Sequence, residues 1–140
     1  MDFGFLSDLI GYQVRRAQVA VFTHFAEAFR TLDLTPGQLG ALCLIQTNPG
    51  LSQSALGAAL GVDRSTVVPL IDRLEARGLV VRAPSPKDRR SHALQLSPAG
   101  TDVLRQAETT VKAHEAVIAG RLSEAERRTL IELLARIGPG

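Results

Sequence analysis

Side chains suited to binding a polyanion occur in two neighbouring segments near the middle of this 140-residue sequence. The first segment is Arg64-Ser65-Thr66, which directly follows Asp63 and precedes apolar residues at helical spacing. At the start of a helix, such side chains can reach base edges and phosphates in a DNA major groove, and the helix dipole adds positive potential there. The second segment, 85–91, holds three cations that can follow a phosphate backbone or enter a narrow minor groove. Both segments therefore predict non-covalent recognition of nucleic acid.

The charge of the chain is concentrated in the same region. The whole sequence carries a net charge of only +2. Between Asp63 and His92 there are seven basic and four acidic residues, whereas the rest of the chain has nine basic and ten acidic residues. A local basic region on a nearly neutral body is typical of a protein that binds a polyanion. A solvated charged surface is the alternative interpretation.

A helix-turn-helix is predicted around the first segment. Ser52 can cap a short helix over 53–60, and Gly61 marks a tight turn. Asp63 can then cap a longer helix that Gly78 ends in the left-handed conformation. The longer helix is expected to bury a stripe formed by Val67, Leu70, Ile71 and Leu74. An ordinary helical hairpin would show the same pattern. In the helix-turn-helix interpretation, the DNA-binding residues of the two helices are Ser54, Arg64, Ser65 and Thr66.

A two-stranded hairpin with a long basic tip is predicted after these helices. The helical spacing of apolar residues ends at 79–82 and 92–96, and these segments are predicted to be short strands on either side of a loop. Asp88 in the loop would repel phosphate, so we expect it to orient Arg90, two residues further on. A solvated charged loop is the alternative. The predicted DNA-binding residues of the tip are Lys87, Arg89 and Arg90.

The helices that flank this central region are expected to pack against a second copy of the chain. The first helix, predicted from about Phe5 to Arg30, is apolar around more of its circumference than one packed face requires. Thr35, Ser97 and Ser123 can cap further helices, and the last of these helices carries a leucine-rich stripe. In so small a chain, a second copy is the expected cover for these apolar surfaces.

The central region resembles the multiple-antibiotic-resistance regulator (MarR) family. The helix-turn-helix pattern of the family is present as Leu51-Ser52-Gln53-Ser54-Ala55-Leu56, Asp63-Arg64-Ser65-Thr66-Val67 and Leu74-Glu75-Ala76-Arg77-Gly78. Its wing signature is present as Leu79-Val80-Val81-Arg82, Pro86-Lys87-Asp88-Arg89-Arg90 and Leu94-Gln95-Leu96-Ser97-Pro98-Ala99-Gly100. The resemblance implies a homodimer, joined by the first and last helices, whose two winged domains read a pseudo-palindromic DNA site. It also implies that Arg90 reaches the minor groove while Asp88 positions it.

The resemblance also implies the type of regulation and the domain arrangement. Members of the family usually repress transcription, and they often release DNA when a small phenolic or aromatic molecule binds. We therefore expect a mainly α fold with a small β-hairpin wing. An N-terminal dimerisation helix would span 1–32, a winged helix-turn-helix 33–100, and C-terminal dimerisation helices 101–140. Pro69 departs from the family pattern, because this position of the recognition helix often carries a polar or basic residue, and proline tends to bend a helix.

Four residues of the first helix are candidates for binding such an effector. Tyr12 and His24 could hydrogen-bond a phenol, and Arg15 or Arg16 could bind a carboxylate or a coenzyme's phosphate. An aromatic acid or its coenzyme A thioester is the expected ligand class. Intersubunit salt bridges and solvated surface side chains are the alternative roles of these residues.

Enzymatic, metal-dependent and membrane functions are not predicted. The three histidines lack the spacing of a zinc motif, and no nucleophile elbow or phosphate-binding glycine loop is present. No apolar run approaches the ~20 residues of a membrane span. We therefore expect no enzyme, no cofactor and no metal. The N-terminus lacks the features of a secretory signal, so a cytoplasmic location is expected.

Two other functions remain open at this point. A winged helix can serve protein–protein assembly, with its wing on an acidic partner. A redox-sensing repressor would depend on Cys43, the only cysteine of the chain. We expect Cys43 to be a buried structural thiol, because its neighbours are apolar and no adjacent cation lowers its pKa.

Overall fold

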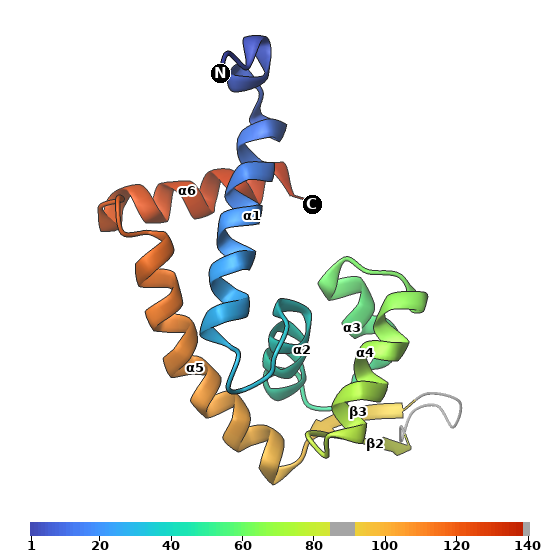
Figure 1. Ribbon diagram of the computed structural model, residues 1–140. Coiled ribbons are helices and arrows are strands. Elements are labelled where there is room, and N and C mark those ends of the chain that lie inside the picture. The colour runs from blue at the N-terminus through green and yellow to red at the C-terminus, as the bar shows by residue number, and fades with distance from the viewer. Residues whose placement is uncertain (85–91, 139–140) are drawn as a thin grey trace.

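The protein is mainly helical and has one small antiparallel sheet (Figure 1). The computed structural model describes residues 1–84 and 92–138. In chain order, the elements are the 3₁₀ turn η1 (Gly4–Asp8), α1 (Ile10–Ala28), α2 (Pro36–Thr47), β1 (Leu51–Ser52), α3 (Gln53–Leu60), α4 (Arg64–Ala76), β2 (Val80–Pro84), β3 (His92–Leu96), α5 (Pro98–Ile118) and α6 (Glu124–Ile137). This order confirms the predicted fold class, a mainly α winged helix-turn-helix with flanking helices.

Five helices start where the sequence predicts them, and each start is capped by a side chain. Thr35, Ser52, Asp63, Ser97 and Ser123 each accept a hydrogen bond from a backbone N–H of the turn that follows. The caps of α2 and α6 are complete capping boxes. Because the first N–H groups of a helix have no partner within the helix, these side chains fix where α2 to α6 begin.

The sheet has three strands in the order β1-β3-β2. Strands β2 and β3 form the predicted hairpin and pair along their whole length. The strand β1 was not predicted. Its two residues pair with β3, Leu51 opposite Leu94 and Ser52 opposite Ala93. Two residues are too few to show the alternation by which a strand is recognised in a sequence.

The prediction for the first helix is wrong at its N-terminal end. The chain does not form one helix from Phe5 onward. Instead, η1 is followed by Leu9 in an extended conformation (φ −92°, ψ 130°), and α1 begins only at Ile10. Within η1 the hydroxyl of Ser7 donates to the carbonyl of Gly4 at 3.1 Å. Such local side-chain bonds compete with helical ones, so the apolar pattern continues across a break in the backbone.

The hydrophobic core lies where α2, α3, α4 and the sheet meet (Figure 1). We call these six elements, from α2 to β3, the winged lobe. Leu42, Leu56, Ile71, Leu74 and Leu94 are fully buried in it. Phe25 of α1 and its C-cap residue Phe29 add two stacked rings to the same core, and α5 adds a leucine and an alanine. The core therefore fixes α4 against both the lobe and the long flanking helices.

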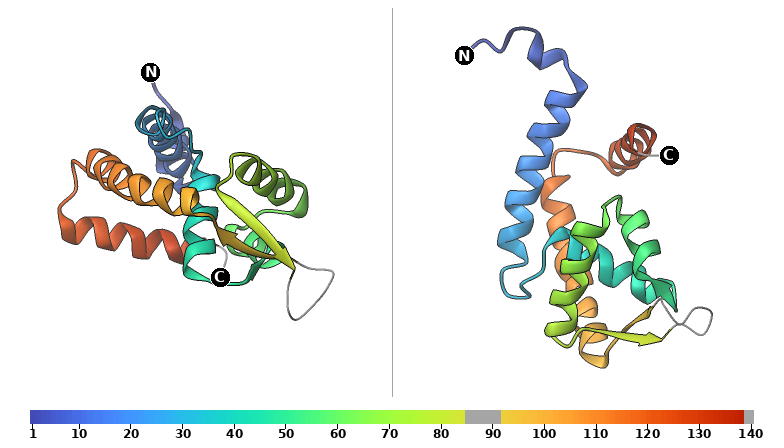
Figure 2. Two further views of the ribbon diagram at one scale, coloured as in Figure 1. Left: turned by 90° about the horizontal axis from the view of Figure 1, so that it is seen from below. Right: turned by 90° about the vertical axis from the view of Figure 1, so that its right-hand side faces the viewer.

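The N-terminal part of the chain and α6 carry apolar side chains that the rest of the chain does not cover. Neither η1 nor α6 has a buried residue. Figures 1 and 2 show η1 projecting at the end of the molecule opposite the sheet, while α6, which crosses α1 in the view of Figure 1, stands apart from it in the right-hand view of Figure 2. No described helix is long and apolar enough to cross a membrane. The following exposed side chains form what we call the apolar surface: Phe3, Phe5, Leu6, Leu9, Ile10, Val14, Val19, Phe22, Leu130, Ile131, Leu133, Leu134 and Ile137.

Candidate nucleic-acid interface

The first turn of α4 presents three polar side chains to solvent. Arg64, Ser65 and Thr66 are exposed, whereas Val67, Ile71 and Leu74 of the predicted stripe are buried in the core and its fourth member, Leu70, is half-buried. The carboxylate of Asp63 accepts the Ser65 hydroxyl at 2.7 Å and the Thr66 backbone N–H at 3.1 Å. These bonds lower the pKa of Asp63 and keep it ionised. Since the Ser65 hydroxyl already donates to Asp63, it offers a ligand only its acceptor lone pairs.

A groove of about 300 Å³ lies beside this turn, between α4 and the N-terminal end of α2. Ser65, Thr66, Pro69 and Arg73 line it from α4, and Thr35 lines it from α2. Pro69 lies inside α4, which continues through it as a helix. Arg73 is exposed, and it was not among the residues predicted from the sequence. The signal was present, because Thr66, Pro69 and Arg73 have the i, i+3, i+7 spacing of one helix face.

Polar contacts hold α3 and the sheet against α4. The Arg82 guanidinium of β2 donates to the Asp72 carboxylate of α4 at 2.6 Å and lies 3.7 Å from Glu75. The same guanidinium lies 3.4 Å from the amide oxygen of Gln53 on α3. Ser54, the next residue of α3, is exposed. The base of the wing is therefore fixed relative to both helices of the helix-turn-helix.

The predicted tip of the wing lies outside the described residues. It contains Lys87, Asp88, Arg89 and Arg90. The strands β2 and β3, which lead into and out of it, are antiparallel neighbours. The DNA contacts of the three cations and the orientation of Arg90 by Asp88 therefore stay predictions.

The four candidate effector residues of α1 do not form one compact site within the chain. The Arg16 guanidinium lies 5.8 Å from the centroid of the Tyr12 ring, and this ring also contacts Phe3 at a centroid distance of 5.9 Å. Arg15 donates to a glutamine one turn further on. His24 lies roughly 18 Å from Tyr12 along the helix axis, at 1.5 Å per residue. The residues thus divide into an N-terminal group of three and a separate histidine.

His24 packs against a second histidine, His114 of α5. The two Nδ1 atoms are 2.7 Å apart, so one of them donates to the other. The rings stack at a centroid distance of 5.0 Å, and Phe25 meets His114 edge-on. His114 is only 2% exposed. Its burial and the neighbouring His24 lower the pKa of His114. The fold thus brings together two histidines whose spacing in the sequence predicts no common site.

Cys43 is exposed on α2, so the prediction of a buried thiol is wrong. The apolar neighbours that suggested burial lie on a different face of the helix. Ala41, Leu42 and Ile45 point into the core, whereas Cys43 lies on the outer side. The remaining burial of the thiol and the carboxylate of Glu108 raise the pKa of Cys43. The thiol is therefore protonated at neutral pH, which makes it a poor nucleophile.

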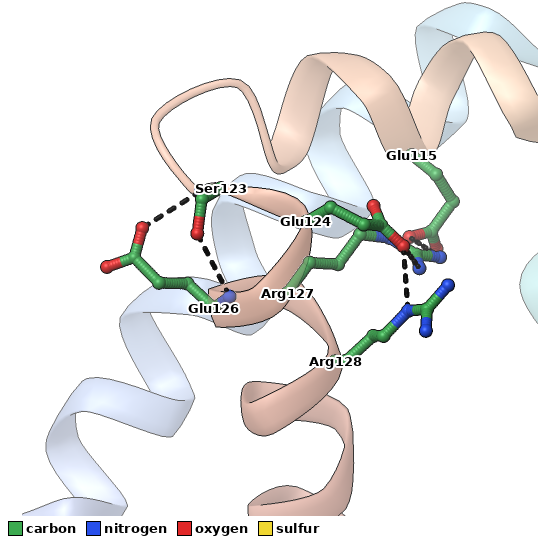
Figure 3. Close-up of polar contacts among 6 residues, drawn as sticks. All are labelled: Glu115, Ser123, Glu124, Glu126, Arg127 and Arg128. Carbon is green, nitrogen blue, oxygen red and sulfur yellow. Dashed lines mark hydrogen bonds and ion pairs between the residues drawn. The ribbon is translucent and has the colours of Figure 1, made fainter.

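Figure 3 shows the corner between α5 and α6. The Ser123 N–H donates to the Glu126 carboxylate at 2.9 Å, and the Glu126 N–H donates to the Ser123 hydroxyl at 3.1 Å. The bonds with Ser123 lower the pKa of Glu126. Arg127 lies 3.9 Å from Glu115 and 3.7 Å from Glu124, beside a hollow of about 460 Å³. In the described part of the chain, no three His, Cys, Asp or Glu side chains are grouped to hold a metal ion. The charged side chains of the corner neutralise one another, which gives them a structural role.

The helix-turn-helix, the exposed turn of α4 and the hairpin that follows define a winged helix-turn-helix protein. The chain belongs to the MarR family, whose sequence model matches residues 32–91. It is 44% identical to a candidate transcriptional regulatory protein for the hcr operon of Thauera aromatica, over 96% of this chain and 81% of that protein.

Two solved structures of the transcriptional repressor CouR are similar to this chain along almost its whole length. The structure of CouR bound to a 23-mer DNA duplex has a TM-score of 0.94 and 40% sequence identity, over 98% of this chain and 97% of that one. The structure of CouR bound to p-coumaroyl-CoA has a TM-score of 0.89 and 38% identity, over 98% of this chain and 96% of that one.

Proposed function

We propose that this chain is a homodimeric, sequence-specific DNA-binding regulator that represses transcription and releases DNA when a small aromatic ligand binds. The observation that carries the proposal is the exposed turn of Arg64, Ser65 and Thr66. The Asp63 cap and the buried stripe of α4 hold this turn in place. The DNA-bound structure of the related repressor CouR, which has the same fold, supports the proposal.

In the proposed complex, the N-terminal turn of α4 enters the major groove. Arg64 and Thr66 contact base edges and phosphates, and Ser65 accepts a hydrogen bond while its own hydroxyl proton remains hydrogen-bonded to the Asp63 carboxylate. Ser54 contacts the backbone from the start of α3. In the wing, Lys87, Arg89 and Arg90 follow the backbone or the minor groove, with Asp88 orienting Arg90.

The apolar surface supports the proposed dimer. Its side chains lie in residues 3–22 and in α6, within the segments assigned to dimerisation. Residues 1–32 and 101–140 would join the two copies, and residues 33–100 would bind DNA. Burying apolar area contributes about 25 cal/mol per Å², so covering this surface with its equivalent on a second copy is favourable. The two lobes would then reach half-sites about 34–36 Å apart.

An extended ligand fits the division of the candidate effector residues into two groups. Tyr12, Arg15 and Arg16 offer an aromatic face and two cations, whereas His24 lies further along α1. A coenzyme A thioester has anionic phosphates at one end and its acyl group at the other. It can therefore contact both groups, with the arginines binding phosphate. The related repressor CouR has been solved with p-coumaroyl-CoA bound, which supports this ligand class.

The proposed role is regulatory and does not include catalysis. The candidate interface consists of side chains that bind and position, and its carboxylate Asp63 is held ionised by the helix it caps. We also propose that the protein acts in the cytoplasm, where its DNA would be.

Nuclease protection of the DNA upstream of the gene tests the proposed DNA binding. We expect two protected half-sites one helical turn apart, because each lobe reads one of them. Thr66→Ala should weaken binding to the protected site by about 1–3 kcal/mol and should change binding to random DNA little. Thr109→Ala removes a hydroxyl from the exposed face of α5 and serves as the matched control. A uniform loss on all DNA would show that Thr66 does not read bases.

Titration of the DNA complex with p-coumaroyl-CoA tests the proposed release. We expect the thioester to dissociate the complex, and free coenzyme A to be far less effective because it lacks the aromatic acyl group. Arg16→Ala should raise the thioester concentration needed, whereas Arg30→Ala, at an exposed position beyond the end of α1, should not. Equal responses of these two variants would remove Arg16 from the ligand site.

A further inference from the structure

The C-terminal end of the recognition helix α4 is attached to the connection between α1 and α2 by one side chain. Arg77, the C-cap residue of α4, donates from Nη1 to the carbonyl of Asp33 at 2.6 Å and from Nη2 to the carbonyl of Leu32 at 3.0 Å. The two nitrogens of one planar guanidinium thus bind two consecutive backbone carbonyls. These partners are 44 and 45 residues away along the chain.

The carbonyls that Arg77 binds belong to a backbone held in a costly conformation. Asp33 has φ 53°, the only positive φ of a non-glycine residue in the described part of the chain. Such residues persist where surrounding contacts over-determine them. Here the Asp33 N–H donates to the carbonyl of Phe29 at 2.8 Å. Phe29 and Leu34, on either side of the connection, are 1% and 5% exposed. The core therefore fixes the connection, and the connection offers Arg77 two acceptors in a defined geometry.

Arg77 lies at the end of α4 opposite the turn of Arg64, Ser65 and Thr66, so a tilt of the helix at Arg77 displaces that turn most. Helix α4 has 13 residues, so its first turn lies roughly 18 Å from its end. A tilt of about 10° around the C-terminal end would move that turn by roughly 3 Å, given this length. Functional side chains generally have to be held within about 0.5 Å of their productive positions. A contact that limits tilting at one end of α4 therefore matters most at the other end.

We propose that Arg77 is a positioning residue for DNA recognition, which holds α4 at a fixed angle to α1 through the two carbonyls of the α1–α2 connection. This inference rests on the proposed DNA-binding function and adds to it the residue that sets the angle of the reading helix. Arg77 does not read DNA itself. It acts through Arg64, Ser65 and Thr66, at the opposite end of the helix.

Two variants of Arg77 distinguish positioning from a direct phosphate contact. Arg77→Ala removes both hydrogen bonds and the charge, whereas Arg77→Lys keeps the charge but replaces two donor nitrogens by one. We expect Arg77→Ala to weaken binding to the protected site about tenfold, which corresponds to about 1.4 kcal/mol. Binding to a scrambled duplex and the dependence on salt should be unchanged. Arg77→Lys should show a smaller loss of the same kind. Arg105→Ala, at an exposed position of α5 with one ion pair, is the control and should match the wild type.

A pair of variants at Asp33 tests the same contact from its other side. Asp33→Gly keeps a positive φ accessible, whereas Asp33→Val cannot adopt it without strain. We expect Asp33→Val to reproduce the loss seen in Arg77→Ala, and Asp33→Gly to bind like the wild type. The double variant Arg77→Ala/Asp33→Val should be no weaker than either single variant, because both remove one contact. Thermal unfolding of each variant shows whether it is folded at the assay temperature.

The duplexes for these assays are those that the wild-type protein discriminates in nuclease protection. Failure of the wild type to protect any site would contradict the proposed function and is seen before any variant is made. An Arg77→Ala variant that binds as tightly as the wild type would overturn the positioning role. So would a loss that is equal on both duplexes with a salt slope lowered by about 0.9, since that identifies a phosphate contact.

Discussion

The winged lobe and α6 contain similar proportions of apolar residues, but many of these residues are buried in the lobe and none is buried in α6. Leu42 in the lobe is 0% exposed, whereas Leu134 in α6 is 44% exposed. The three helices and three strands of the lobe enclose a core to which α1 and α5 also contribute. Helix α6 has an apolar stripe of the same kind, but no other part of the described chain covers it. The difference indicates which region folds through its own contacts and which one needs a second copy.

The polar contacts of the two regions also differ in how far apart in the sequence their partners lie. In the lobe they join distant parts of the chain: Arg77 binds the α1–α2 connection, and Arg82 lies 3.4 Å from Gln53 of α3. In α6 the ion pairs of Arg128 and Arg136 are local ones, at i,i+4 spacing on an exposed surface, and Arg127 reaches only the adjoining helix α5, 3.9 Å from Glu115. Such pairs contribute only about 0.3–0.5 kcal/mol each. The lobe is thus held rigid for recognition, while α6 is stable as a helix and presents a surface for association.

The largest expected effect is the loss of the dimer after charges are placed on α6. Leu130→Asp together with Leu134→Asp should weaken dimerisation by about 5 kcal/mol, because two apolar contacts are lost and two carboxylates would be buried. The dimer dissociation constant would rise several thousandfold. Analytical ultracentrifugation measures this change, and Glu132→Gln on the same helix is the control. A dimer that survives the double change would place the interface elsewhere.

A smaller effect is expected for an alanine substitution inside the lobe. Leu42→Ala should lower the free energy of unfolding by about 2–5 kcal/mol, because it leaves a cavity in a closed core. Leu133→Ala in α6 should cost much less in unfolding of the monomer, since its side chain is half exposed there. Urea denaturation of both variants, in the Leu130→Asp/Leu134→Asp background, makes the comparison in monomers. Equal losses would remove the distinction between the two regions.

Gly100→Ala should destabilise the junction of the lobe and α5 by about 1–3 kcal/mol, as overpacking does. A Cβ at this position would collide with the backbone of Leu79, so the helix start must shift. Ser97 caps the same turn and also donates to the carbonyl of Gly78 at 2.5 Å. Thermal unfolding measures the effect. Gly120→Ala, where a Cβ would meet a carbonyl at 3.2 Å rather than collide, is the milder control.

A modest pH dependence of stability is expected from His114. Its pKa is lowered from 6.5 in the folded chain, by burial and by His24, against a smaller opposing effect of Glu115. The unfolded chain therefore binds this proton more readily. Stability should be complete well above pH 6.5 and fall as the pH drops below that value. His114→Asn, which keeps a hydrogen-bonding group but does not titrate, should flatten the profile between pH 7 and 5. An unchanged profile would assign the dependence to other groups.

The smallest effect is expected for Cys43→Ser. The raised pKa of Cys43 keeps its thiol protonated at neutral pH, and its side chain lies outside the core. DNA affinity should therefore be the same with and without mild peroxide, in the wild type and in the variant. A peroxide response that the variant lacks would revive the redox-sensing hypothesis.

The local features of the fold could be predicted from the sequence, and the long-range ones could not. Caps such as Ser52 and Asp63 act within one turn, so residue type and spacing were sufficient to locate α3 and α4. The contacts of Arg77 with the α1–α2 connection and of His24 with His114 depend on how helices pack. No spacing rule connects residues so far apart in the chain.

Two errors of the sequence analysis have the same physical origin. Cys43 was expected to be buried because its neighbours are apolar, but a helix turns by about 100° per residue, so adjacent residues face different sides. The first helix was expected to continue through Leu9 because apolar residues recur there, although local bonds of Ser7 favour a 3₁₀ turn. Hydrophobicity alone identified neither the exposed face nor the break.

The geometry of the candidate site was predicted in part. The exposure of Arg64, Ser65 and Thr66 follows from the stripe that α4 buries, and this stripe was visible in the sequence. The commitment of the Ser65 hydroxyl to Asp63 was not visible, because an N-cap can bind different groups of the following turn. The groove that contains Arg73 depends on where α2 packs, which is again a long-range feature.

The most direct test of DNA recognition is fluorescence anisotropy of the wild-type protein, with labelled DNA from its own upstream region and a scrambled duplex at two salt concentrations. We predict that the native fragment binds about a thousandfold more tightly, as expected at the lower end for specific readers. The affinity for both duplexes should fall as salt rises, with a slope of about 0.9 per neutralised phosphate. Equal, weak binding to both duplexes would contradict the account.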